Sequence, residues 1–130
     1  MKKFILPVAL IVLFAAGCAK EGLDGDAILV IKPAHHGTPI VSTGAYRDSV
    51  FIKFNTQDMP SDPTHDYDAL FVGEVGEDHI HIENVKWGEY YVFCTGWDTS
   101  INARVYGGVP VKIKRKDRKD EIVVNVPVVE

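Results

Sequence analysis

The stretch HIHIENVKWGEYYVFCTGWD, residues 79–98, decides the fold of this chain. In its first part Ile80 and Ile82 alternate with His79, His81 and Glu83. Its second part is rich in aromatic and β-branched side chains. A period of two and this enrichment are the signature of β-strands. The stretch therefore predicts one strand over 78–85 and another over 89–97.

The same signature recurs on both sides of this stretch. Short β-type runs separated by turn residues extend over 27–32, 48–55, 67–75, 103–115 and 120–129. No convincing helical periodicity follows the first twenty-odd residues. Seven short strands in about 100 residues is the number typical of a β-sandwich. We therefore expect an all-β, seven-stranded sandwich.

The segments between these runs carry their own signals. GED (76–78) predicts a tight hairpin turn, and KRKDRKD (114–120) predicts a charged, solvated hairpin tip. Gly107 and Gly108 suggest a β-bulge before the strand continues. Pro110 and Pro127 each lack a backbone donor, so each is expected at a sheet edge or a bulge.

Residues 79–98 also resemble the closing half of prealbumin-like sandwich domains, such as the carboxypeptidase regulatory-like and collagen-adhesin B-type repeats. The resemblance rests on the Gly-x-Tyr element of Gly88 and Tyr90, on Gly96 and Trp97, and on the valine-rich strand 121–129. It implies a prealbumin-like Greek-key order. The opening half lacks the pattern of these families, so an immunoglobulin-like order is the alternative.

The Gly-x-Tyr element has a structural meaning of its own. Gly88 permits a turn with positive φ. The ring of Tyr90 is then expected to enter the core, where its hydroxyl needs a polar partner. Backbone at a sandwich corner is a common partner for such a tyrosine. The two residues therefore predict a structural role and no catalysis.

The N-terminus predicts export and lipidation. Two lysines precede an apolar run from Phe4 to Ala16, which is shorter than the roughly 20 residues needed to span a membrane. A basic start, a short apolar core and small residues predict a signal peptide over 1–17. The small residues before Cys18 resemble the lipobox of bacterial lipoproteins. The resemblance implies acylation of Cys18. The polar, glycine-bearing residues that follow predict a lipidated tether over 18–26, and the β-type runs predict a folded domain over 27–130.

Ala19, directly after the cysteine, points to the outer membrane of a Gram-negative cell, because the enterobacterial sorting rule reserves Asp there for the inner membrane. Lys20 and Glu21 resemble the charged tag that some lineages use for surface export. A lipid-anchored protein on the periplasmic or the surface-exposed face of the outer membrane is therefore expected, with the membrane as its first partner.

Charge and cysteine content reduce the number of function classes that the chain can belong to. Of 14 Lys and Arg, two lie in the predicted signal, which leaves 12 against 18 Asp and Glu and a mature charge of −6. This balance argues against nucleic acid as a partner. If Cys18 carries lipid, Cys94 is the remaining cysteine, and its place in a β-type run predicts core packing.

No motif for catalysis or for a bound cofactor stands out, so an enzyme is the least favoured hypothesis. The favoured one is a binding or assembly module for an envelope protein or a glycan. Trp87, Trp97 and Tyr106, with Tyr91, are the candidate partner-binding residues, because exposed aromatic side chains anchor partners. The loops 33–47 and 56–68 would contribute as well.

A metal-handling lipoprotein is the alternative hypothesis. His79 and His81 lie two residues apart on one strand face, roughly 7 Å from each other. Two imidazoles can share a metal ion with a third ligand, and Glu83 is the candidate. The four aspartates of the loop 56–68 favour a solvated loop over calcium binding, because the Asp-x-Asp-x-Asp-Gly order is missing.

Overall fold

The structure is a computed structural model that describes residues 21–130. The predicted signal peptide over 1–17 and the predicted acylation at Cys18 lie outside these residues. The described part contains eight strands and one 3-10 turn, Arg115–Asp117. The strands are β1 Ala27–His35, β2 Thr38–Pro39, β3 Ser49–Phe54, β4 Ala69–Val72, β5 Ile80–Val85, β6 Gly88–Asp98, β7 Ala103–Ile113 and β8 Glu121–Val128. Each of the seven predicted runs contains a strand, and the two-residue β2 is an addition.

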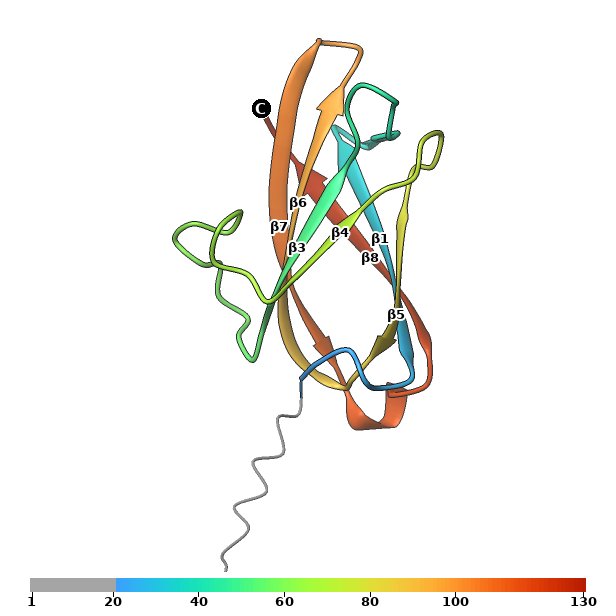
Figure 1. Cartoon of the computed structure of the whole chain (residues 1–130), viewed down its shortest axis with the longest axis vertical. Coiled ribbons are helices and arrows are strands. Elements are labelled where there is room, and N and C mark those ends of the chain that lie inside the picture. Colours follow the sequence, from blue (N-terminus) through green and yellow to red (C-terminus); the bar gives the residue numbers. More distant parts are fainter. Residues whose placement is uncertain (1–20) are drawn as a thin grey trace, which may run out of the picture.

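Two sheets pack against each other, so the all-β prediction is confirmed (Figure 1). In the first sheet β1 lies between β8 on one side and β2 and β5 on the other. The second sheet has the order β4-β3-β6-β7. The β1–β8 pair is parallel, and the other pairs are antiparallel. Among residues 21–130, no helix has the length and apolar character that crossing a bilayer requires.

The core fills the space between the sheets, as period-two alternation predicts. Leu29 and Ile31 of β1 and Ile82 of β5 are fully buried from the first sheet. Val92 and Cys94 of β6 are fully buried from the second. Burying such apolar surface contributes about 25 cal/mol per Å² removed from water, which makes this cluster the main source of stability.

Two predicted hairpins are wrong. The segment GED (76–78) follows β4, which lies in the second sheet, and precedes β5, which lies in the first. A turn is present there, since Gly76 has φ +88° and the Glu77 amide donates to the Glu74 carbonyl. Likewise KRKDRKD (114–120) crosses from β7 to β8 in the other sheet. Alternation identifies strands and turn residues identify turns, but neither says which strands pair.

The predicted bulge at Gly107 and Gly108 is also wrong, because the β6–β7 register is continuous from one end to the other. The glycines instead allow close packing. A Cβ at Gly107 would collide with the backbone carbonyl of Pro127, and one at Gly108 would lie 2.6 Å from the Tyr91 ring. The prolines confirm the edge prediction, since Pro110 lies on β7 and Pro127 on β8, an edge strand of each sheet.

One side of the sandwich is closed and the other is open. On the closed side, β7 and β8 are joined by an antiparallel bridge between Tyr106 and Val129. On the open side, β4 and β5 form the opposite edges of their sheets, and in the described residues they are not paired with each other. The open side therefore leaves two strand edges next to each other.

The corner between β5 and β6 holds the first described residues of the chain. Tyr90 is fully buried, its hydroxyl donates to the Lys86 carbonyl at 2.7 Å, and the Gly22 amide donates to that hydroxyl at 3.1 Å. Gly88 has φ +146°, which turns the chain into β6. The Lys86 amide in turn donates to the Gly22 carbonyl at 2.9 Å. Residues 21–26 of the predicted tether therefore belong to the folded body.

Candidate functional site

The outer face of the second sheet is apolar at its centre, where an antiparallel sheet usually presents polar side chains to water. Cross-strand pairs place Leu70, Phe51 and Phe93 in one row, and Tyr106 lies in the next row. Leu70 and Tyr106 are 44% and 46% exposed. Together with Tyr67, which packs on Phe51, these residues form a surface that we term the aromatic face.

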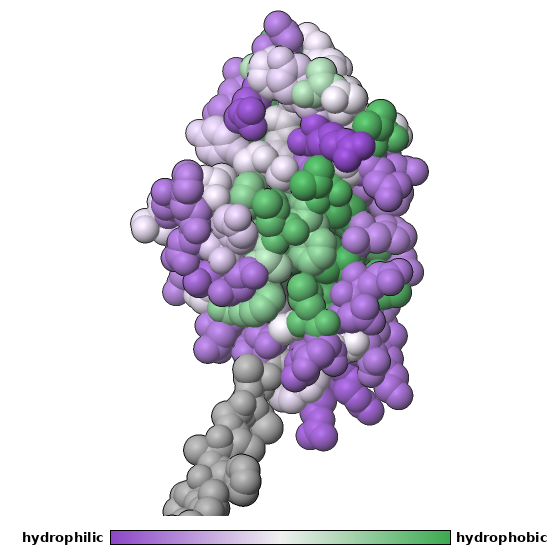
Figure 2. All heavy atoms as spheres, in the orientation of Figure 1, coloured by the Kyte–Doolittle hydropathy of each residue, from purple (hydrophilic) through white to green (hydrophobic). Residues whose placement is uncertain are grey.

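The rings of the aromatic face touch in sequence. The ring centroids lie 5.2 Å apart for Tyr67 and Phe51, 6.4 Å for Phe51 and Phe93, and 6.2 Å for Phe93 and Tyr106. Tilted contacts at such distances are the favourable geometry for aromatic pairs. The edge strand β4 adds Val72, which is 50% exposed. Figure 2 shows apolar side chains at the centre of one face of the molecule, in the region where Figure 1 places β4, ringed by hydrophilic ones.

A second aromatic pair lies towards the end of β6. The rings of Tyr46 and Trp97 stack nearly parallel, with centroids 4.1 Å apart and an angle of 8°. A cavity of about 170 Å³ beside them is also lined by Arg47 and Arg104. Tyr46 is 43% exposed, so it forms the outer layer of the stack. We refer to these four residues as the Trp97 stack.

The structure brings together two of the three residues predicted to bind a partner. Trp97 pairs with Arg104 and Thr95 pairs with Tyr106, so Trp97 and Tyr106 lie in adjacent rows of one face. Trp87 precedes the other end of β6, which at about 3.3 Å per residue is roughly 30 Å away. Its side chain packs against the core.

Sequence reasoning missed Phe51 and Phe93 as parts of the aromatic face and Tyr46 as part of the Trp97 stack. The signal for Phe51 was present, because alternation in 48–55 places Phe51 on the face opposite Val50 and Ile52. Phe93 follows from its pairing with Phe51. Tyr46 lies in a loop, where no periodic pattern indicates its contacts.

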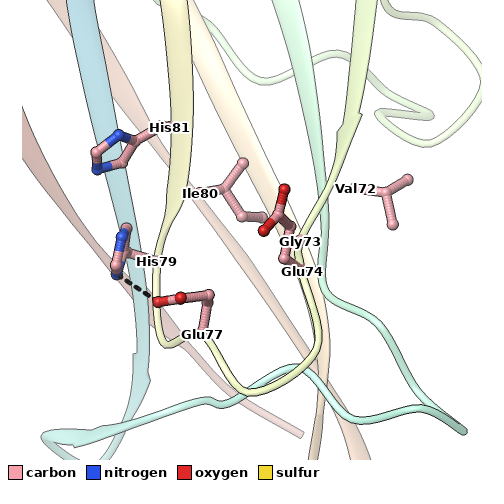
Figure 3. A pocket seen from close by; sticks show the side chains of 7 residues that line it. All are labelled: Val72, Gly73, Glu74, Glu77, His79, Ile80 and His81. Carbon is pink, nitrogen blue, oxygen red and sulfur yellow. Dashed lines mark ion pairs between the residues drawn. The ribbon is translucent and has the colours of Figure 1, made fainter.

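The predicted histidine pair lies on the open side of the sandwich. His79 and His81 line a cavity of about 250 Å³ between the end of β4 and the start of β5, and Figure 3 shows Glu77 turned towards His79. The ring centroids are 4.8 Å apart. The His79 Nδ1 atom lies 2.8 Å from Asp78 Oδ1 and 3.8 Å from Glu77 Oε2. Hydrogen bonding to His79 lowers the pKa of the Asp78 carboxyl below its usual value.

Glu83, the predicted third ligand, does not line this cavity. The β1–β5 register shifts between Ile82 and Val85, where Asn84 has φ +60°. In the part of the chain that the structure describes, no three His, Cys, Asp or Glu side chains are grouped to hold a metal ion. In the loop 56–68, Asp66 pairs with Lys53 at 2.8 Å, and Asp68 accepts from the Phe54 amide.

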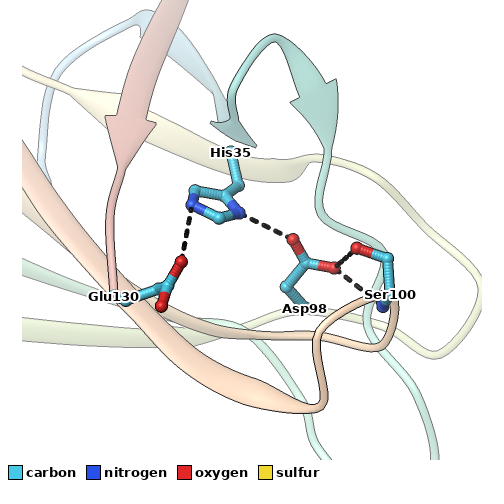
Figure 4. Close-up of polar contacts among 4 residues, drawn as sticks. All are labelled: His35, Asp98, Ser100 and Glu130. Atoms are coloured by element: carbon cyan, nitrogen blue, oxygen red, sulfur yellow. Dashed lines mark hydrogen bonds and ion pairs between the residues drawn. The ribbon is translucent and has the colours of Figure 1, made fainter.

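A buried histidine joins three chain segments at the end of the sandwich opposite the Tyr90 corner (Figure 4). His35 is 5% exposed, and its Nδ1 atom lies 2.7 Å from Asp98 Oδ2. Its Nε2 atom lies 4.0 Å from Glu130 Oε1. The Ser100 hydroxyl donates to Asp98 Oδ1 at 2.6 Å. Hydrogen bonds from Ser100 and His35 lower the pKa of Asp98 to about 2.

This cluster contains a serine, a histidine and an aspartate, but their contacts are not those of a hydrolase. A nucleophilic serine needs its hydroxyl on the histidine that serves as base. Here the Ser100 hydroxyl bonds to the aspartate instead. The arrangement ties the end of β1 to the end of β6 and to the C-terminal residue, which is a structural role.

Asp48 is a buried carboxylate beside Cys94. It is 1% exposed, and its Oδ1 atom has no hydrogen-bond partner among the described residues. Burial raises the pKa of Asp48 to about 6, against the opposing effect of the Ser42 hydrogen bond. Cys94 is fully buried and free, and burial, together with the Asp48 charge, raises the pKa of its thiol. A thiol in such surroundings is unreactive.

No protein-family model matches this chain. No curated protein matches it either. A solved structure that resembles the fold is a DUF4876 family protein from Bacteroides thetaiotaomicron VPI-5482, at 16% sequence identity and a TM-score of 0.41. The match covers 80% of this chain, which spans 24% of the length of that one. A likeness of this degree carries no argument about this chain.

Proposed function

We propose that this chain is a non-catalytic lipoprotein, anchored in the outer membrane through acylated Cys18, that binds a protein or glycan partner of the cell envelope. The observation that carries the proposal is the aromatic face. Exposed tyrosine and apolar side chains cover the outside of a sheet whose inside already faces a complete core. Aromatic side chains in such positions dominate the energetics of protein interfaces and stack on ligand rings.

The position of residue 21 indicates how the domain would be oriented relative to the membrane. The Tyr90 corner fixes the entering chain at the end where β6 begins. Trp97 lies near the other end of that strand, roughly 30 Å away at about 3.3 Å per residue. A domain anchored upstream of residue 21 would therefore present the Trp97 stack away from the bilayer.

The chemistry of the Trp97 stack favours a ligand with an acidic group. Arg47 and Arg104 are both exposed and line the cavity next to the stacked rings. Guanidinium groups bind carboxylates and phosphates through paired hydrogen bonds. A ring for stacking beside a cation suits an acidic sugar or an acidic peptide side chain.

We also propose that the two sheets have the prealbumin-like Greek-key order. If β2 is set aside, the first sheet holds the first, fourth and seventh strands, and the second holds the other four. Immunoglobulin constant domains group the first, second, fourth and fifth strands instead. The observed grouping therefore favours the prealbumin-like order over the immunoglobulin alternative.

The test is partner capture with matched variants. The acylated full-length protein is probed on a glycan array and by crosslinking in native envelopes, beside the double variant Tyr46→Ala, Tyr106→Ala. We expect at least a tenfold loss of affinity, which is about 1.4 kcal/mol for the double variant, since a few aromatic anchors carry most of the binding energy of an interface. The control is Leu23→Ala with Val123→Ala, two exposed apolar positions outside the second sheet. Equal binding by both variants would refute a partner-binding role for the aromatic face and the Trp97 stack.

Metal handling is the second candidate, and the geometry of His79 favours it. A carboxylate on Nδ1 leaves Nε2 of His79 as the coordinating atom, which is how second-shell groups orient metal ligands. The His81 ring is close enough to share an ion. This candidate predicts Zn or Cu in purified protein that is lost in the His79→Ala, His81→Ala variant. An unchanged metal content in that variant removes it.

A further inference from the structure

We propose that the loop between β7 and β8 contacts the phosphate groups of anionic lipid headgroups at the membrane surface. We name it the basic loop and define it as residues 112–119, which are the last two residues of β7 and the first six residues of the connection to β8. The inference rests on the proposed lipid anchor at Cys18 and adds a second, electrostatic contact with the same membrane.

The basic loop concentrates positive charge in an acidic protein. It holds six of the 12 Lys and Arg residues that follow residue 17, and one carboxylate, Asp117. Its net charge is therefore +5, whereas the mature chain carries −6. Its six cations are Lys112, Lys114, Arg115, Lys116, Arg118 and Lys119.

These cations are available to an outside partner. All six side chains are exposed. Within residues 21–130, the ion pairs of the structure involve none of them. The 3-10 turn Arg115–Asp117 is held by the Asp117 amide, which donates to the Lys114 carbonyl at 2.9 Å. The short turn and its flanking residues therefore carry a cluster of cations without ion pairs among the described residues, although Arg118 Nη1 donates to the Arg115 carbonyl at 3.1 Å.

The loop lies at the end of the body where the chain enters. Glu21 lines one cavity of about 450 Å³ together with Lys112, Lys114 and Arg115. Figure 1 shows the β7–β8 connection at the same end of the body as the first described residues, and Figure 2 shows strongly hydrophilic side chains projecting there. Glu21 lies three residue steps after Cys18, and three steps reach about 10 Å when extended.

That distance is what makes the charge effective. An anionic membrane surface attracts cations within about one Debye length, roughly 8 Å at physiological salt. Acyl chains on Cys18 would keep Glu21 within about 10 Å of the headgroups. The basic loop beside Glu21 can therefore approach the headgroups to within this range. Each cation near such a surface strengthens binding about fivefold. The contact would orient the domain, with the Trp97 stack directed outward.

Lysine labelling on vesicles tests the contact. The acylated full-length protein is reconstituted into phosphatidylcholine vesicles and into phosphatidylcholine–phosphatidylglycerol vesicles, and acetylation of each lysine is followed by mass spectrometry. We expect Lys114, Lys116 and Lys119 to react at least fivefold more slowly on the anionic vesicles, with recovery in high salt. Lys32, which is exposed on the first sheet, is the internal control and should react equally on both.

The outcomes separate the two proposals. Protein that floats with both vesicles but shows the same labelling on each overturns the electrostatic contact and leaves the lipid anchor standing. Protein that floats with neither vesicle overturns both. If the lysines of the basic loop react slowly on both kinds of vesicle, the membrane shields them sterically and the charge-based contact is overturned. The same conclusion follows if slow reaction on anionic vesicles persists in high salt. The variant Lys116→Gln, Lys119→Gln should lose about 25-fold of the preference for anionic vesicles, and an undiminished preference overturns the proposal.

Discussion

Removing the hydroxyl of Tyr90 should destabilise the protein and loosen its N-terminal segment. This hydroxyl is completely buried, donates to the Lys86 carbonyl and accepts from the Gly22 amide. In Tyr90→Phe both backbone groups lose their partner in a site that water does not reach. An unsatisfied buried polar group costs about 1–3 kcal/mol, so we expect a loss of about 2 kcal/mol. For a domain of this size that lowers Tm by roughly 8 °C.

The matched control is Tyr91→Phe on the same strand. The Tyr91 side chain points to the outer face and packs over Gly108, and its hydroxyl has no hydrogen bond within residues 21–130. This change should alter the free energy of unfolding by less than about 0.5 kcal/mol. Urea unfolding followed by circular dichroism gives the free energies, and hydrogen exchange reports the Gly22 and Lys86 amides. If the two variants unfold at the same urea concentration and Gly22 stays protected, the corner does not hold the entering chain.

Three further changes test other parts of the fold. Because burial raises the pKa of Asp48 to about 6, its ionised form is a cost to the folded state that is present above pH 6 and relieved as the pH falls towards 4. Asp48→Asn should thus raise stability at pH 7 by up to about 3 kcal/mol and flatten Tm between pH 4 and 6; a drop in Tm at pH 7 would contradict this. Hydrogen bonds lower the pKa of Asp98 to about 2, so its stabilising contribution is complete above pH 4 and disappears as the pH falls to 2. Asp98→Asn should therefore be less stable at neutral pH and lose acid dependence in that range, and an unchanged acid titration of Tm argues against the His35 contact. Gly107→Ala should cost about 1–3 kcal/mol because its Cβ meets backbone, while Gly44→Ala, whose Cβ points into open space, should be near neutral in the same urea titration.

The histidine pair shows which parts of a side-chain cluster residue spacing can predict and which it cannot. Alternation places His79 and His81 on one face of a strand, and their rings do lie 4.8 Å apart. Spacing also favoured Glu83, two positions further along, yet the register shift after Ile82 interrupts the regular strand there. The carboxylates beside His79 are Asp78 and Glu77, which come from the turn that precedes β5. A bulge is set by pairing with another strand, so a single run of residues does not reveal it.

The aromatic face shows the same limit. Phe51 and Phe93 belong to separate strands and face outward side by side because β3 pairs with β6. Tyr67 and Tyr46 come from loops, and their rings contact this sheet only after the chain has folded back over it. The sequence alone gave no reason to prefer Trp97 over Trp87 as a partner-binding residue. In the structure, the length of β6 places the two side chains near opposite ends of that strand.

By itself, the sequence determined that this chain forms short strands and a corner at Gly88 and Tyr90. The alternation of side chains and the freedom of glycine are local properties, so they can be read one segment at a time. Only the tertiary structure decided which strands pair, that the segments 73–79 and 114–120 cross between sheets, and that the Gly107 backbone packs against β8. These outcomes depend on how two sheets bury one shared core, and that is a property of contacts between residues far apart in the chain.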